Sequence, residues 1–411
     1  MSSTSCRLAL TAALLCAALP AQGQQKPVNL PDGPGKDAVV TYCSGCHGLA
    51  RVANTAYSQD HWSTAIRMMI NFGVPIPPDQ VITVTDYLSK NFPERPMPVA
   101  KIMPGPVQVT IREWQVPTAG SRPHDPLAAR DGSIWYTGQL SNKLGRVDPK
   151  TGQIREYVLK TPQTAPHGLV EDRSGNIWFT GNHTGVIGKL DPRTGEVTEY
   201  PMPDPKAKDP HSLHFDQSGI LWFTMQQSNL MARLDPRNGE IKLIPSPTPR
   251  SRPYGVIVNS KGVPFVALFG TNKIAAIDPQ TLAVREYTLP DEKARPRRIA
   301  IAPDDIVWYA DYSRGYLGRL DPATGQVTEW QSPSGPRSGP YGIVFTKGAV
   351  WYNESGARPN TIVRFDPKSQ QFQSWLIPSG GYIVRKMDVL PDGNPVTVSS
   401  TMNTVGMVEV K

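Results

Sequence analysis

Three residues near the start of the chain have the spacing that binds haem covalently. Cys43 and Cys46 are separated by two residues, and His47 follows at once. Two thiols at this spacing reach the two vinyl groups of one haem, while the adjacent imidazole faces the iron. A redox-active disulfide between the two cysteines is the alternative. The pattern predicts one covalent haem c on Cys43, Cys46 and His47.

The sixth ligand of such an iron is commonly a methionine, which raises the reduction potential. The segment from Trp62 through Arg67-Met68-Met69 to Gly73 resembles the middle helix of short, class I-like bacterial c-type cytochrome domains. That resemblance implies Met69 as the ligand. The alternatives are an open position, core packing by both methionines, or another side chain, namely Met68, Met97, Met103 or His61.

A second set of polar residues recurs at one position of a long repeat. Imidazole, guanidinium and phenol groups share this position: His124, His167, His211, Tyr254, Arg297, Tyr341 and Tyr382. If the repeats bring them together, they form a concave mouth suited to an anionic or hydroxylated small molecule, or to a partner surface.

The elements that must position these groups fall into two domains. In residues 34–93, a helix is predicted from Asp60 to Gly73, with Trp62, Ile66 and Met69 on one face. A second helix follows Pro77-Pro78 and ends at Pro93, packed by Val81, Ile82, Val84, Tyr87 and Leu88. We predict a small all-α cytochrome c domain, followed by a semi-rigid proline-rich linker at 94–106.

Residues 107–411 repeat a set of four phrases about every 43 residues, as four-stranded propeller blades do. Turns of the Asp-Pro-x-Thr-Gly type separate strands, and large aromatic residues recur at one register: Trp135, Trp178, Trp222, Trp308 and Trp351. Seven outer-strand phrases occur, and the first precedes any inner strand. We therefore predict an all-β, seven-bladed propeller in which residues 107–117 complete the last blade and remove the open edges.

These phrases resemble the streptogramin B lyase (virginiamycin B lyase) family over essentially all of residues 107–411. The matching phrases are Pro-His/Tyr-Gly and Trp-Phe-Thr, followed by an Ile-Gly-Lys-Leu strand. The resemblance implies a propeller enzyme that opens a cyclic depsipeptide by elimination, with Mg2+ and a histidine as general base or acid. Because one fold hosts many activities, the resemblance specifies the fold more strongly than the reaction.

The family's catalytic pattern falls on His167, His211 and Tyr254, with Asp209 as the carboxylate two residues before the second histidine. One position departs from the pattern: the phrase that begins at Trp222 ends in Met225, where the family has glutamate. A thioether is a poor ligand for Mg2+, so this departure weighs against lyase activity.

Residues 1–23 have the pattern of a secretory signal, with Arg7 before an apolar run from Leu8 to Leu19 and a small-residue cleavage site. The run is shorter than the ~20 residues that a spanning helix needs. We expect a periplasmic or otherwise exported protein, soluble after cleavage and without a membrane span. The formal net charge of +8 is scattered along the chain, which indicates ordinary solubility and no nucleic-acid partner.

Three hypotheses follow. The first is electron transfer through the haem, with a redox partner protein or a small-molecule substrate at the propeller mouth. The second is a Mg2+-dependent lyase with an accessory haem, acting through His167, Asp209, His211 and Tyr254. The third is a non-catalytic binding or sensor scaffold.

Overall fold

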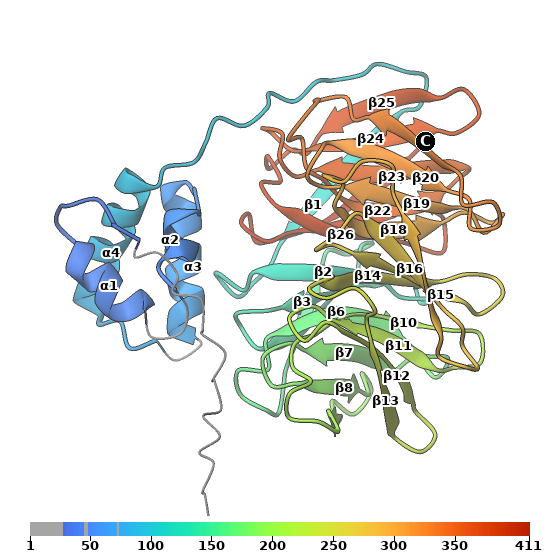
Figure 1. The fold of residues 1–411 in the computed structure, drawn as a ribbon, viewed down its shortest axis with the longest axis horizontal. Coiled ribbons are helices and arrows are strands. Elements are labelled where there is room, and N and C mark those ends of the chain that lie inside the picture. The colour runs from blue at the N-terminus through green and yellow to red at the C-terminus, as the bar shows by residue number, and fades with distance from the viewer. Residues whose placement is uncertain (1–27, 45–47, 72–73) are drawn as a thin grey trace, which may run out of the picture.

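The computed structural model describes residues 28–44, 48–71 and 74–411, which form a small helical unit beside a β-propeller (Figure 1). The helices are α1 (Lys36–Cys43), α2 (Ala50–Ala53), α3 (Gln59–Asn71) and α4 (Pro78–Asn91). The predicted signal and two members of the haem motif, Cys46 and His47, lie outside the described residues. Within the described ranges, no helix is both long and apolar enough to cross a membrane.

The helical unit has a hydrophobic core of its own. Trp62 and Ile66 on α3 are buried in one cluster with Val84 and Leu88 on α4. The prediction that Ile82 packs this helix is wrong, because its side chain is 70% exposed. Residues spaced three and four apart share a helix face, and Ile82 is out of step with the face formed by Val84 and Leu88.

A close helix crossing joins the two ends of this unit. Gly35 stands just before α1, and a Cβ at this position would come within 2.7 Å of the Tyr87 Cβ on α4. Gly35 also has a φ of 95°, which favours glycine. The Tyr87 hydroxyl donates a hydrogen bond to the Pro31 carbonyl, at 2.5 Å. The chain before α1 is therefore fastened to the last helix.

The linker runs along the propeller. The Ala100 amide donates to the Arg358 carbonyl at 3.2 Å, and the Met103 amide donates to the Ser374 hydroxyl at 2.9 Å. Both partners belong to blade 6, so the extended segment is tied to that blade before it enters β1.

Seven four-stranded antiparallel sheets form the propeller, which confirms the predicted seven-bladed fold. Blade 1 contains β2 (Pro123–Ala128), β3 (Ile134–Gly138), β4 (Lys143–Val147) and β5 (Ile154–Val158). Blade 2 contains β6 (Pro166–Glu171), β7 (Ile177–Gly181), β8 (Val186–Leu190) and β9 (Val197–Pro201). Blade 3 contains β10 (Pro210–Phe215), β11 (Leu221–Met225), β12 (Leu230–Asp235) and β13 (Glu240–Pro245). Blade 4 contains β14 (Pro253–Val258), β15 (Pro264–Leu268), β16 (Lys273–Ile277) and β17 (Val284–Thr288).

Blade 5 contains β18 (Pro296–Ile301), β19 (Val307–Asp311), β20 (Tyr316–Leu320) and β21 (Val327–Gln331). Blade 6 contains β22 (Pro340–Thr346), β23 (Ala349–Glu354), β24 (Thr361–Asp366) and β25 (Gln371–Leu376). Blade 7 contains β26 (Val384–Val389), β27 (Pro395–Ser399), β28 (Thr404–Val410) and, as its outermost strand, β1 (Val109–Gln115). The pairing of β1 with β28 joins the two ends of the propeller and closes the ring.

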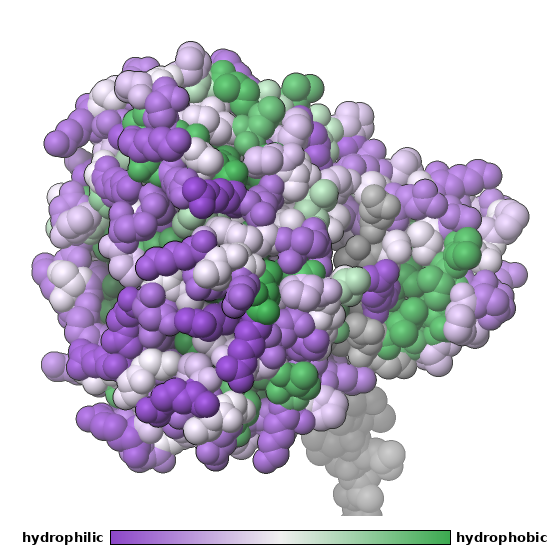
Figure 2. Space-filling model, turned by 180° about the vertical axis from the view of Figure 1, so that it is seen from behind, coloured by the Kyte–Doolittle hydropathy of each residue, from purple (hydrophilic) through white to green (hydrophobic). Residues whose placement is uncertain are grey.

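Repeated side chains explain why each blade forms. Trp178 is 2% exposed, stacks on Tyr200 of the outer strand at 5.4 Å, and donates to Asp172 at 2.8 Å. The Phe179 ring lies over Gly188 so closely that a Cβ there would meet the ring at 2.0 Å. Large and small residues at fixed offsets therefore interlock within a blade. The propeller surface seen from behind is mostly hydrophilic (Figure 2).

Candidate functional site

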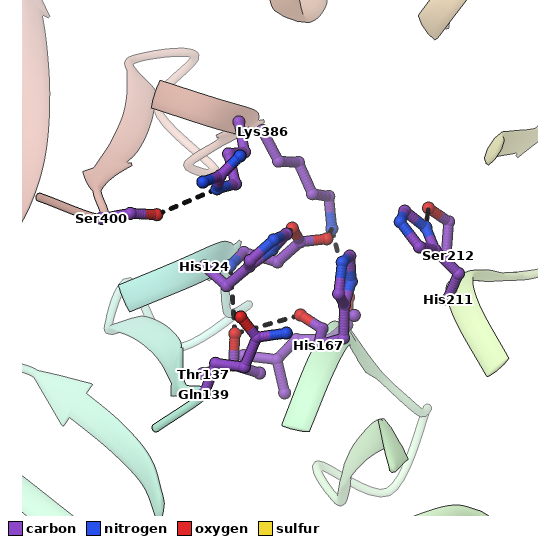
Figure 3. A network of polar contacts seen from close by, with 12 residues as sticks. His124, Thr137, Gln139, His167, His211, Ser212, Lys386 and Ser400 are labelled. Atoms are coloured by element: carbon purple, nitrogen blue, oxygen red, sulfur yellow. Dashed lines mark hydrogen bonds and ion pairs between the residues drawn. The ribbon is translucent and has the colours of Figure 1, made fainter. Parts of the chain in front are cut away.

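A ring of side chains surrounds one end of the propeller axis. Each innermost strand contributes its second residue to this ring. That residue lies next to a β-bulge in the pairing of the innermost strand with the second strand of the same blade. Three histidines follow one another, with ring centroids 3.7 Å apart for His124 and His167, and 3.8 Å apart for His167 and His211. Tyr254 comes next, 4.0 Å from His211. Three of the predicted catalytic residues, His167, His211 and Tyr254, are therefore brought together. His167 and His211 lie side by side in Figure 3.

The seventh member of this ring is Arg385, and the prediction of Tyr382 at this position is wrong. In blade 7 the bulge lies between Val384 and Met387, as it lies between Pro210 and Leu213 in blade 3. Tyr382 precedes β26 and turns toward the helical unit. Distance from the second strand gives the correct register: Arg385 stands eleven residues before Val396, as His124 stands eleven before Trp135.

The ring histidines are neutral. Burial, followed by the positive charges of Arg385 and Arg122, lowers the pKa of His124 well below its usual value. Burial also lowers the pKa of His167 and of His211, and each is lowered further by the preceding histidine. The Nδ1 atom of His167 is buried without a hydrogen-bond partner. A neutral imidazole with an unused nitrogen can accept or donate a proton to a bound molecule.

A second ring lies one residue deeper in the channel. Asp125 accepts two hydrogen bonds from Arg298, at 3.0 and 3.1 Å, and a third contact joins it to His124 Nδ1 at 2.9 Å. Lys386 Nζ is 3.9 Å from the same carboxylate (Figure 3). Arg298 also donates to Ser212 at 2.7 Å. These ion pairs cross the channel and fix the base of the histidine mouth, above a cavity of about 390 Å3.

Two tyrosines and an arginine complete the opposite side of the mouth. The hydroxyls of Tyr254 and Tyr341 are 2.5 Å apart, and the Arg297 guanidinium lies 3.9 Å from the Tyr341 ring centroid. Burial opposes ionisation of Tyr254, but Arg297 and Arg298 outweigh it and hold the pKa of Tyr254 below its usual value. Burial raises the pKa of Tyr341. Tyr254 is therefore the more acidic member of the pair.

The other two positions of the lyase pattern, Asp209 and Met225, do not supply ligands for a metal ion at this mouth. The Asp209 carboxylate accepts the backbone N–H of Gln227 at 2.6 Å and of Ser228 at 3.3 Å, so it fixes the turn after β11. Burial raises its pKa to about 6. Met225 is fully buried in the apolar core of blade 3.

The residues present do not fit a Mg2+ ion at the expected position. Mg2+ prefers several oxygen ligands, whereas the carboxylate of Asp209 is taken up by backbone amides and Met225 offers none. His124, Asp125 and His167 do bring three ligand atoms within 4.8 Å of one another. However, the Asp125 charge is already paired with Arg298, and Lys386 lies nearby. The positive charges of Arg298 and Lys386 repel a divalent metal ion.

The described part of the predicted haem site lies in the helical unit. Cys43 ends α1, is half-buried against the core, and has a thiol whose pKa is raised by burial. Met69 lies on α3 and is half-buried. Met97 lies in the linker, and Met103 is fastened to blade 6; nothing is described of the Met68 side chain.

The helical unit contacts the propeller beside the histidine mouth. His61 on α3 lies edge-on to Tyr382, with ring centroids 3.9 Å apart, and its Nε2 is 3.0 Å from the Thr401 hydroxyl. The Tyr382 hydroxyl is 2.8 Å from both Ser58 and Glu94. The sequence analysis considered His61 only as a possible iron ligand. Its contacts make it part of the domain interface, in the helix that also carries Met69.

Comparison with known proteins agrees with the propeller. The family model of the virginiamycin B lyase family matches residues 97–277. The propeller is virginiamycin B lyase-like. A streptogramin B lyase structure is 25% identical, with a TM-score of 0.67, over 74% of this chain and 98% of that one.

Two further solved structures show the same fold. Virginiamycin B lyase from Staphylococcus aureus is 22% identical, with a TM-score of 0.67, over 73% of this chain and 99% of that one. A catalytically inactive histidine-to-alanine variant of that enzyme, solved with quinupristin, is 21% identical, with a TM-score of 0.67 and the same coverage. No curated protein matches the chain.

Proposed function

We propose that the protein is an exported c-type cytochrome that transfers electrons through one haem, and that its propeller mouth binds the substrate or redox partner that exchanges those electrons. The haem would be held by Cys43 and Cys46, with His47 and Met69 on the iron. When bound, it supplies one-electron chemistry. The observation that carries this proposal is the Cys-x-x-Cys-His spacing on a helical unit that sits against the mouth.

The chain's own residues support the coupling. α3 carries Met69 at one end and His61 at the other, and His61 contacts the blade 7 loops that adjoin Arg385. A molecule bound at the mouth would therefore lie close to the helix that holds the proposed iron ligand. The neutral His167 and the acidified Tyr254 could move protons as electrons leave the bound molecule.

A lyase reaction is supported less well. An elimination needs a base, an acid and a means to hold the developing charge. His167, His211 and Tyr254 are in place, but Asp209 caps a turn and Met225 is buried among apolar residues. A binding or sensor role without catalysis would use the same mouth but would need no reversible redox change.

The proposal is tested by production of the full chain in a bacterial host that attaches haem c in its periplasm. The purified protein should keep haem after denaturation, with a mass increase of one haem, and should cycle reversibly between oxidised and reduced forms. Cys43→Ser should lower the covalently retained haem, whereas Met103→Leu, on blade 6, should not. A protein without covalent haem in this host would refute the proposal.

A further inference from the structure

A small cleft lies between α3 and the propeller. Tyr57, His61 and Ala65 line it from the helical unit, and the propeller contributes Arg122, Ile383, Arg385, Ser400 and Thr401. Its volume is about 60 Å3, which is enough for a group of a few heavy atoms and too little for a peptide. The cleft adjoins the ring of side chains at the propeller mouth, because Arg385 belongs to both.

The cleft is cationic. Two of its lining residues are arginines, and none is acidic. The Arg385 Nε donates to the Ser400 hydroxyl at 3.1 Å, and its two terminal nitrogens make no hydrogen bond to the described residues. The NH1 group of Arg122 donates to Gln139 at 2.7 Å. A planar guanidinium that lines a cleft and has two terminal nitrogens without a partner among the described residues is the kind of group that binds carboxylates in a bidentate manner.

The positive charges of Arg122 and Arg385 also repel one another. Burial, and then the charge of Arg385, lowers the pKa of Arg122 to about 9. Burial, Arg358, Arg385 and Arg122 lower the pKa of His61 to about 3, so this imidazole is neutral at the edge of the cleft. A negative ligand between the arginines would replace this repulsion by attraction.

We propose that the cleft between α3 and the loops of blades 1 and 7 binds a small carboxylate, or the carboxylate end of a larger ligand, between Arg122 and Arg385. This deepens the proposed function, since it rests on the mouth as the binding site and names an organic acid as the ligand class. The rest of such a ligand would extend toward His124, whose pKa is lowered by burial and then by the charges of the same two arginines. The proposed binding of a carboxylate does not depend on haem.

Thermal unfolding of the full chain in sodium acetate tests this inference, with ionic strength held constant by sodium chloride. Acetate should raise the unfolding midpoint saturably, because a ligand that binds the folded state alone stabilises it. Arg385→Gln should weaken the apparent affinity at least tenfold. Arg385→Lys, which keeps the charge but loses the planar fork, should weaken it to a smaller extent.

Arg193→Gln is the matched control, because Arg193 is an exposed arginine whose side chain is paired with Asp191 in an outer turn. This variant should respond to acetate as the wild-type protein does. An equal response in all four proteins, or no response to acetate in the wild-type protein, would overturn the inference. Cys43→Ser should retain the acetate response, so failure of the haem proposal and failure of this one are distinguishable.

Discussion

The three neutral histidines of the mouth should make the propeller sensitive to acid. In the folded state the pKa values of His124, His167 and His211 lie well below 6.5, while an unfolded histidine titrates near 6.5. Below that pH the unfolded chain binds protons that the folded chain excludes. The three histidines therefore cost no stability above about pH 7, and they lower the free energy of unfolding progressively as the pH falls through 6.5.

The size of this loss follows from the shift. At pH 5.5, one pH unit below the unfolded pKa, each buried neutral histidine costs about 1.4 kcal/mol of stability. Three such residues cost about 4 kcal/mol, a large share of the ~5–15 kcal/mol that holds a typical domain folded. Other buried groups, including His61 and His214, add to the total pH dependence.

A comparison of variants isolates the ring. Urea unfolding at pH 7.5 and pH 5.5, followed by tryptophan fluorescence, gives the loss for each protein. In His211→Gln the loss should be smaller than in the wild-type protein by about 1.4 kcal/mol. His183→Gln, at an exposed side chain, should lose as much as the wild-type protein. Equal losses in His211→Gln and the wild-type protein would refute the reasoning, because they would mean that His211 takes up its proton in the folded state.

Three other outcomes are expected. Gly188→Ala should lower the free energy of unfolding by about 3 kcal/mol, since its Cβ would overlap the Phe179 ring. Gly195→Ala, at a left-handed turn with open space around it, should lower it by only about 1 kcal/mol. Equal losses of stability in urea unfolding would contradict this packing. Tyr382→Phe should increase proteolytic cleavage within linker residues 94–106, because it removes the hydroxyl that contacts Ser58 and Glu94, and an unchanged cleavage rate would show that this contact does not hold the helical unit. The wild-type protein with Mg2+ should not open a streptogramin B depsipeptide, as followed by chromatography. Met225→Glu should unfold at a lower urea concentration without gaining activity, since it places a carboxylate in an apolar core. Turnover by either protein would contradict our description of the mouth.

The fold was predictable from the sequence because its information is local and repeated. One set of phrases, with Trp178 and its counterparts at a fixed offset, specifies a blade, and seven copies specify the ring. The helix that carries Trp62 and Ile66 was predicted from the 3.6-residue period. Ile82 was misplaced because a short helix with apolar residues at adjacent positions does not show which face is buried.

The site was predictable only in part, because it depends on register and on contacts between distant segments. The histidines of blades 1 to 3 follow a clear phrase. Arg385 was missed because blade 7 lacks that phrase, and Gly381-Tyr382 imitates it. The contact of His61 with Thr401 joins residues 340 positions apart, and no local pattern reports such a contact. The ion pair of Asp125 with Arg298 was missed for the same reason.

The central claim is that a haem, ligated by a methionine of α3, is attached to the helical unit beside this propeller. Its most direct test is the absorption spectrum of the full chain, purified from the haem-attaching host, first oxidised and then reduced with dithionite. We predict a c-type reduced spectrum, and in the oxidised form a weak far-red band that Met69→Leu abolishes and Met103→Leu retains. A haem spectrum with the far-red band unchanged in Met69→Leu would contradict the ligand assignment, and a protein without a haem spectrum would contradict the account as a whole.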